Sequence, residues 1–114
     1  MFGSLVIRRL SALVTSGVVD RLTMDAYPDD EHIQWVRIMA RVIGADADLI
    51  EIGAKSGKAD YPMMSQKVTN NGASVNVTTP VYGSGDYQLY AEFTTTTIGE
   101  MMELVAFGVR ELKA

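Results

Sequence analysis

The sequence predicts an α+β fold in which an antiparallel sheet of about four to five strands packs against two or three helices. Residues 87–93 alternate apolar and polar side chains, the pattern of a strand that is buried on one face. Pro28 is followed by three acids, Asp29–Glu31, which is typical of the first turn of a helix. The predicted order is α-β-α-β-β-β-β-α, in a single α+β domain over residues 1–114, since this length suits one core.

The first helix is predicted from apolar residues at helical spacing, namely Leu5, Val6, Leu10, Leu13 and Val14. Arg8 and Arg9 lie outside this stripe, and no acid precedes Asp20. The helix is expected to pack on its own domain, although an organellar presequence, a membrane-surface helix and a contact with another subunit stay open as alternatives. Thr15–Gly17 supplies its end, and residues 18–26 then alternate as a strand.

The second helix is predicted to run from Pro28 to about Ile43 and to end at Gly44. Its apolar residues are Ile33, Trp35, Val36, Ile38, Met39, Val42 and Ile43. They cover more than one narrow stripe, so we expect this helix to pack on two sides, against the sheet and against another helix or subunit.

The second half of the chain is predicted to be a meander of strands. Residues 48–54 and 58–68 are expected to pair around a turn at Ser56–Gly57, and Asn71–Gly72 is the clearest hairpin signal. Alternating residues predict a further strand over 75–81.

The last helix is predicted to follow the strand at 87–93. Thr97 and Glu100 have the spacing of a capping box at the start of a helix. The apolar residues of the expected helix face are Ile98, Met102, Val105, Val109 and Leu112.

Composition narrows the classes of partner and compartment. A net charge of −4 with scattered basic residues argues against nucleic-acid binding, which needs clustered Lys and Arg. The absence of cysteine removes disulfides and thiolate metal sites and fits a cytoplasmic protein. No apolar run approaches the ~20 residues of a membrane span, so no transmembrane segment is expected.

No motif in the chain predicts catalysis, a cofactor or a metal. Gly53–Ala59 resembles a phosphate-binding loop, but its glycine spacing is one residue short and Tyr61 and Pro62 follow where a helix is needed. His32 adjoins the acids Asp29–Glu31, but neighbouring side chains on a helical turn diverge and do not converge on one ion. The sequence therefore favours a protein that is not an enzyme.

The expected function is that of a non-enzymatic protein-interaction or regulatory module, which forms a homo-oligomer and binds a protein partner. In a chain this short, 47% apolar residues predict exposed apolar patches. The candidate interface or pocket residues are Trp35, Met39, Leu89 and Tyr90. Tyr90 suits an interface contact, with cross-strand packing as the other interpretation. The alternative function is a small-ligand sensor, with an apolar pocket between the sheet and the second helix lined by Trp35, Met39 and Leu89.

Overall fold

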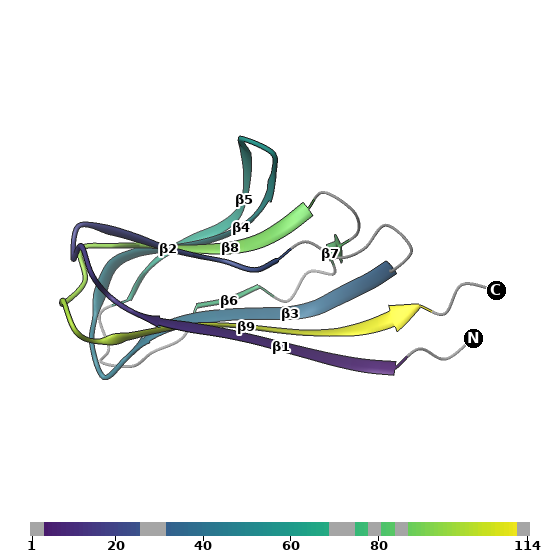
Figure 1. The fold of residues 1–114 in the computed structure, drawn as a ribbon, viewed down its shortest axis with the longest axis horizontal. Coiled ribbons are helices and arrows are strands. Elements are labelled where there is room, and N and C mark those ends of the chain that lie inside the picture. The colour runs from purple at the N-terminus through teal and green to yellow at the C-terminus, as the bar shows by residue number, and fades with distance from the viewer. Residues whose placement is uncertain (1–3, 26–31, 69–74, 78–80, 84–86, 112–114) are drawn as a thin grey trace.

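The protein is all-β in the computed structural model, which describes residues 4–25, 32–68, 75–77, 81–83 and 87–111. The strands are β1 (Ser4–Leu13), β2 (Val19–Thr23), β3 (His32–Ile43), β4 (Ala47–Ser56), β5 (Ala59–Val68), β6 (Val75–Val77), β7 (Val81–Gly83), β8 (Tyr87–Thr94) and β9 (Met101–Glu111). They form two antiparallel sheets that face each other (Figure 1).

Strands that are consecutive in the sequence are not all in the same sheet. Sheet A has the order β1-β9-β3-β6, and β7 also pairs with β3; sheet B has the order β2-β8-β4-β5. The chain crosses from β5 in sheet B to β6 and β7 in sheet A, returns to β8 and crosses again to β9. The predicted meander is therefore wrong, because β5 and β6 lie in opposite sheets, and so do β7 and β8.

The predicted α+β class is also wrong, since the described residues contain no helix. The three segments expected to be helices contain β1, β3 and β9. These strands lie side by side, with β9 pairing along β1 on one side and along β3 on the other.

A β-bulge explains the helical appearance of β3. The pairing of β3 with β9 shifts between Trp35 and Arg37, so one extra residue is inserted there. The buried positions consequently change from odd numbers, Ile33 and Trp35, to the even numbers Ile38, Ala40 and Val42. A period of two with one such slip gives apolar spacings of two, three and two, which resemble the spacing along a helix face.

Strand β9 resembles a helix in sequence for a different reason, because both of its faces carry apolar side chains. Its core face has Met102, Leu104 and Ala106, and Val105 and Phe107 lie between them on the other face. A helical stripe can therefore be drawn through residues that actually alternate. Thr97 and Glu100 form a turn before β9, in which the Glu100 amide donates to the Thr97 carbonyl oxygen at 3.2 Å.

Several local predictions are confirmed. The strands expected at 18–26, 48–54, 58–68 and 87–93 correspond to β2, β4, β5 and β8. The strand expected at 75–81 is described as β6 and β7, and residues 78–80 between them lie outside the described part.

The turn predicted at Ser56–Gly57 is confirmed. Gly17 and Gly44 were expected to end helices, but each follows a strand; all three glycines have positive φ and lie between strands. The predicted hairpin at Asn71–Gly72 and the acids Asp29–Glu31 lie outside the described residues.

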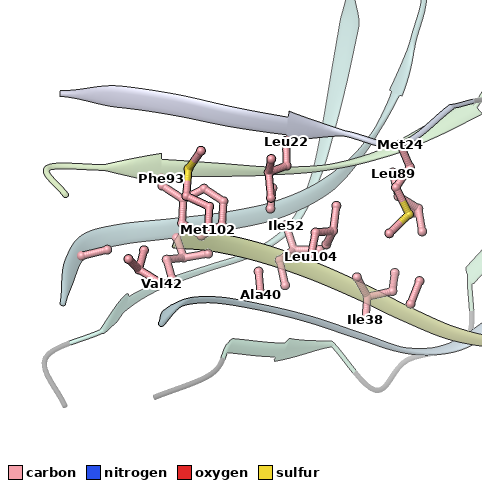
Figure 2. Close-up of a cluster of buried hydrophobic side chains, with 14 of the residues drawn as sticks. Leu22, Met24, Ile38, Ala40, Val42, Ile52, Leu89, Phe93, Met102 and Leu104 are labelled. Atoms are coloured by element: carbon pink, nitrogen blue, oxygen red, sulfur yellow. The ribbon is translucent and has the colours of Figure 1, made fainter. Parts of the chain in front are cut away.

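The core lies between the two sheets. Figure 2 shows side chains from both sheets meeting there, among them Leu22, Ile52, Leu89 and Phe93 from sheet B and Ile38, Val42, Met102 and Leu104 from sheet A. The largest fully buried side chains are Trp35, Tyr90 and Phe93.

The buried carboxylate of Asp20 holds the loop between β1 and β2. Its Oδ1 accepts hydrogen bonds from the amides of Thr15 at 3.1 Å and Ser16 at 3.0 Å, and its Oδ2 accepts from the Gly17 amide at 2.9 Å. Burial alone would raise the pKa of Asp20, but these hydrogen bonds outweigh burial and leave the pKa below its ordinary value. The ionised carboxylate is therefore part of the folded loop.

We expect Asp20→Asn to lower the free energy of unfolding by about 2 kcal/mol, because an amide cannot accept all of these bonds. The depressed pKa means that Asp20 stabilises the fold fully above its unfolded-state pKa of about 3.9, and that this stabilisation is lost as the pH falls through the lower folded-state value. Urea unfolding at neutral and acidic pH measures both effects. Asp48→Asn, at an exposed position, is the control and should change stability by less than about 0.5 kcal/mol. Equal urea midpoints for Asp20→Asn and the wild type would contradict the assigned role.

Candidate functional site

The outward surface of sheet A is the candidate functional site, and we name it face A. It is built from alternate residues of three adjacent strands, because side chains that are paired across an antiparallel sheet point to the same face. Face A consists of Leu5, Ile7, Arg9, Ser11 and Leu13 on β1, Met101, Glu103, Val105, Phe107 and Val109 on β9, and Arg37, Met39, Arg41 and Ile43 on β3.

Face A exposes large apolar side chains. Leu5 is 71% exposed, Ile7 57% and Leu13 54%, while Phe107 and Met39 are half-buried between their neighbours. Three strands about 4.8 Å apart and ten residues long at 3.4 Å each span roughly 500 Å² of sheet. This area includes the polar residues of face A, so its apolar part is smaller. Large apolar side chains that are exposed together on one face often mark a binding surface.

A row of three charges crosses face A. Glu103 is only 5% exposed, and its carboxylate forms ion pairs with Arg9, whose Nη2 lies at 2.6 Å, and with Arg41, whose Nε lies at 3.0 Å. The two guanidinium groups come from the strands on either side of β9 and compensate a carboxylate that would otherwise be costly to bury.

The charge of face A is positive. Arg37 is the third arginine and donates to Asn76 Oδ1 from Nε at 3.2 Å and from Nη2 at 3.0 Å. Three arginines against the single Glu103 give face A a net charge of +2, although the whole chain carries −4. Face A therefore combines exposed apolar side chains with an excess of positive charge.

The outer surface of sheet B is organised around Tyr90, which is fully buried. Its ring lies against Gly53, where an added Cβ would come within 2.5 Å of the Tyr90 hydroxyl and 2.7 Å of the Tyr61 carbonyl oxygen. The Tyr90 hydroxyl donates to Glu51 Oε2 at 2.8 Å. Burial raises the pKa of Tyr90, and its hydrogen bond to Glu51 raises it further.

Arg21 lies over the Tyr90 ring and connects the two edge strands of sheet B, β2 and β5, by hydrogen bonds. Its guanidinium carbon lies 4.2 Å from the centroid of the Tyr90 ring, within the range of a cation–π contact. It donates to both carboxylate oxygens of Asp60, at 3.0 and 2.8 Å, and to Glu92. The hydrogen bond to Asp60 is the main cause that raises the pKa of Arg21, and the same bond lowers the pKa of Asp60. This network joins β2, β8, β4 and β5.

A polar hollow lies at the end of the sandwich where β3 turns into β4. Its volume is about 540 Å³, and its lining consists of Gly44, Ala45, Asp46, Thr95, Thr96, Thr97 and Glu100. The lining offers hydroxyl and carboxylate oxygens. Across the residues that are described, no group of three or more His, Cys, Asp or Glu residues could hold a metal ion.

The structure separates the four candidate residues predicted from the sequence. Trp35 is 1% exposed and packs in the core, whereas Met39 lies on face A, across the bulge. Leu89 packs in the core, and Tyr90 lies on the opposite face of sheet B, as the alternation predicts, but it is buried. Within the described ranges there is no helix to form the predicted pocket, and Trp35 and Met39 lie on different faces of sheet A, while Leu89 belongs to sheet B. The side chain of His32 lies outside the described part.

Most of face A was missed by sequence reasoning. Leu5 and Leu13 were assigned to the apolar stripe of the first helix, and Arg9 was placed outside that stripe. A signal was present in Leu5, Val6 and Ile7, since consecutive apolar residues rich in β-branched types favour a strand over a helix.

No protein-family model matches this sequence, and the comparison with curated proteins finds no match. The part of the chain that the structure covers has no helix that is long and apolar enough to cross a membrane.

Proposed function

We propose that this protein is a non-enzymatic interaction module that docks a protein partner on face A. The observation that carries this proposal is the exposure of Leu5, Ile7 and Leu13 beside half-buried Met39 and Phe107 on one sheet surface. Removing such a surface from water is favourable in proportion to its apolar area, and a complementary partner would supply that burial.

Charge indicates the chemistry of the partner surface. Face A carries three arginines and one covered glutamate, so a partner with acidic groups among its apolar side chains complements it. A basic partner would place like charges together at a site that is being desolvated, which is costly. The proposed partner is therefore a protein surface that is apolar and acidic.

The alternative function, a small-ligand sensor, has weaker support. Trp35 and Met39 lie on different faces of sheet A, and Leu89 belongs to the other sheet, so the predicted apolar pocket lacks its lining. The hollow at the end of the sandwich is lined by oxygen-bearing side chains such as Asp46 and Glu100, which does not suit an apolar ligand.

A pair of labelled peptides tests the proposal. Both alternate leucine with a charged residue, which is glutamate in one peptide and lysine in the other. Fluorescence anisotropy should show the glutamate peptide binding more tightly than the lysine peptide, because only the former complements the arginines of face A. Equal affinities, or no binding of either peptide, would contradict the proposed docking chemistry.

Met39→Glu places a negative charge between Arg37 and Arg41 on face A, and we expect it to weaken binding of the glutamate peptide about tenfold, close to 1.4 kcal/mol. The new glutamate can pair with those arginines, so the strand should persist. Ile98→Glu is the matched control, since Ile98 is 67% exposed but lies outside face A. If Met39→Glu bound the peptide as tightly as Ile98→Glu, face A would not be the docking surface.

A further inference from the structure

We propose that two copies of this chain pair edge to edge through β1 and form one continuous antiparallel sheet across a two-fold axis. The proposal rests on a comparison of the strand edges of the two sheets. An unpaired edge presents free N–H and C=O groups to other strands, and natural proteins protect such edges by short strands, proline, bulges or charges.

The other edges carry this protection. Edge strand β5 contains Pro62 and the charged Asp60 and Lys67, and its pairing with β4 is irregular at two places. Edge strand β2 is only five residues long. At the far edge of sheet A, β6 and β7 are three residues each.

Strand β1 has neither the short length, the proline nor the irregular pairing of these edges, and its only charged residues are Arg8 and Arg9. It is ten residues long, contains no proline, and pairs with β9 in one register from Ser4↔Arg110 to Leu13↔Met101 without a shift. No described strand is hydrogen-bonded to its other edge, and β1 runs along the border of sheet A in Figure 1. It also carries the exposed Leu5, Ile7 and Leu13.

Both arginines of β1 are engaged within their own chain. Arg9 forms an ion pair with Glu103 on β9. Arg8 lies on the core-facing side of the sheet, where it is half-buried and has an interaction of its own. A long, regular, apolar edge of this kind is suited to pairing with another strand, and a second β1 is identical in length and regularity.

Two-fold symmetry restricts the register of the pair. Antiparallel pairing about an axis perpendicular to the sheet must place one residue of β1 opposite its own copy. Registers centred on Arg8 or Arg9 would put like charges directly opposite each other, which is destabilising. Registers centred on Ile7 or on Leu10 avoid this, and they pair Ser4–Leu10 or Ile7–Leu13 with the same segment of the second copy.

The pairing would join two copies of face A side by side on one continuous sheet. The composition predicts a homo-oligomer, and this pairing would be its contact. The pairing does not depend on whether face A binds an acidic partner. Its test therefore uses the purified protein alone, without the peptides, so the two proposals can fail separately.

Cysteine cross-linking tests the edge contact without background, because the chain has no cysteine. Directly opposed residues of an antiparallel pair are close enough for a disulfide. Under copper–phenanthroline oxidation in air, we expect Ile7→Cys or Leu10→Cys to form a covalent dimer at least about tenfold faster than Ile98→Cys. The reason is that opposed residues of paired strands hold the two thiols close together. Far-UV circular dichroism confirms that the three variants keep the wild-type fold.

Native mass spectrometry of the wild type gives the second readout, and a dimer is expected. Ile7→Lys should shift the protein toward monomer, since a charge would face its own copy or an apolar Leu13, whereas Ile98→Lys should leave the dimer intact. A monomeric wild type would overturn the proposal. A wild-type dimer in which neither Ile7→Cys nor Leu10→Cys links faster than Ile98→Cys would also overturn it, because the contact would then lie elsewhere.

Discussion

Trp35→Ala is expected to lower the free energy of unfolding by about 4 kcal/mol. Trp35 is the biggest fully buried side chain and is 1% exposed. Its truncation removes apolar contacts and leaves a cavity that the paired strands around it cannot collapse to fill. Urea unfolding followed by far-UV circular dichroism measures the loss, because the variant lacks the single tryptophan needed for fluorescence.

Val36→Ala is the matched control for this change. Val36 is the next residue in β3, at the bulge, and its side chain is exposed. Its truncation should change stability by less than about 0.5 kcal/mol. Similar losses at both positions would show that the effect comes from the strand backbone and not from the buried indole.

Gly108→Ala is expected to lower the free energy of unfolding by about 3 kcal/mol through overpacking. An added Cβ would lie 2.7 Å from Trp35 Cε3, 2.8 Å from the Gln34 carbonyl oxygen and 3.0 Å from Ile33 Cγ2. Gly108 is in β9 between β1 and β3, so neither neighbouring strand can withdraw without breaking hydrogen bonds. Urea unfolding gives the loss, and Trp35 fluorescence reports whether the indole has moved.

The double variant Trp35→Ala/Gly108→Ala separates the contributions of the side chain and the backbone. Removing the indole relieves one of the three close contacts and leaves those with Gln34 and Ile33. The two losses should therefore fall short of additivity by about 1 kcal/mol. Strict additivity would mean that the indole does not cause the strain at Gly108.

The faces on which Leu89 and Tyr90 lie could be predicted from the alternation of residues along the sequence. The alternation of β8 correctly placed Leu89 in the core and Tyr90 on the other face of sheet B. The burial of Tyr90 did not follow, because it depends on Gly53 beneath the ring and on Arg21 above it, and both residues come from other strands. A strand pattern states which way a side chain points, but not what covers it.

Face A was hidden for a related reason. Met39 was recognised as a candidate, but Leu5, Phe107 and Arg41 come to the same surface through pairing between segments far apart in the chain. With apolar residues on both faces of β9, alternation alone could not show which face meets the second sheet.

The positions at which elements end were readable in the residues themselves, because Gly17, Gly44 and Gly57 adopt a backbone conformation that other residues rarely tolerate, although Gly17 and Gly44 were expected to end helices. Whether the segments between those turns became helices or strands was not readable, since the bulge after Trp35 and the two apolar faces of β9 imitate helical spacing. That choice rests on long-range hydrogen bonds: β1 and β3, both in the first half of the chain, each pair with β9 near its end. Local propensity is worth little against a full ladder of such bonds and the core that it closes, so tertiary pairing selected the all-β fold and, with it, the surface that became face A.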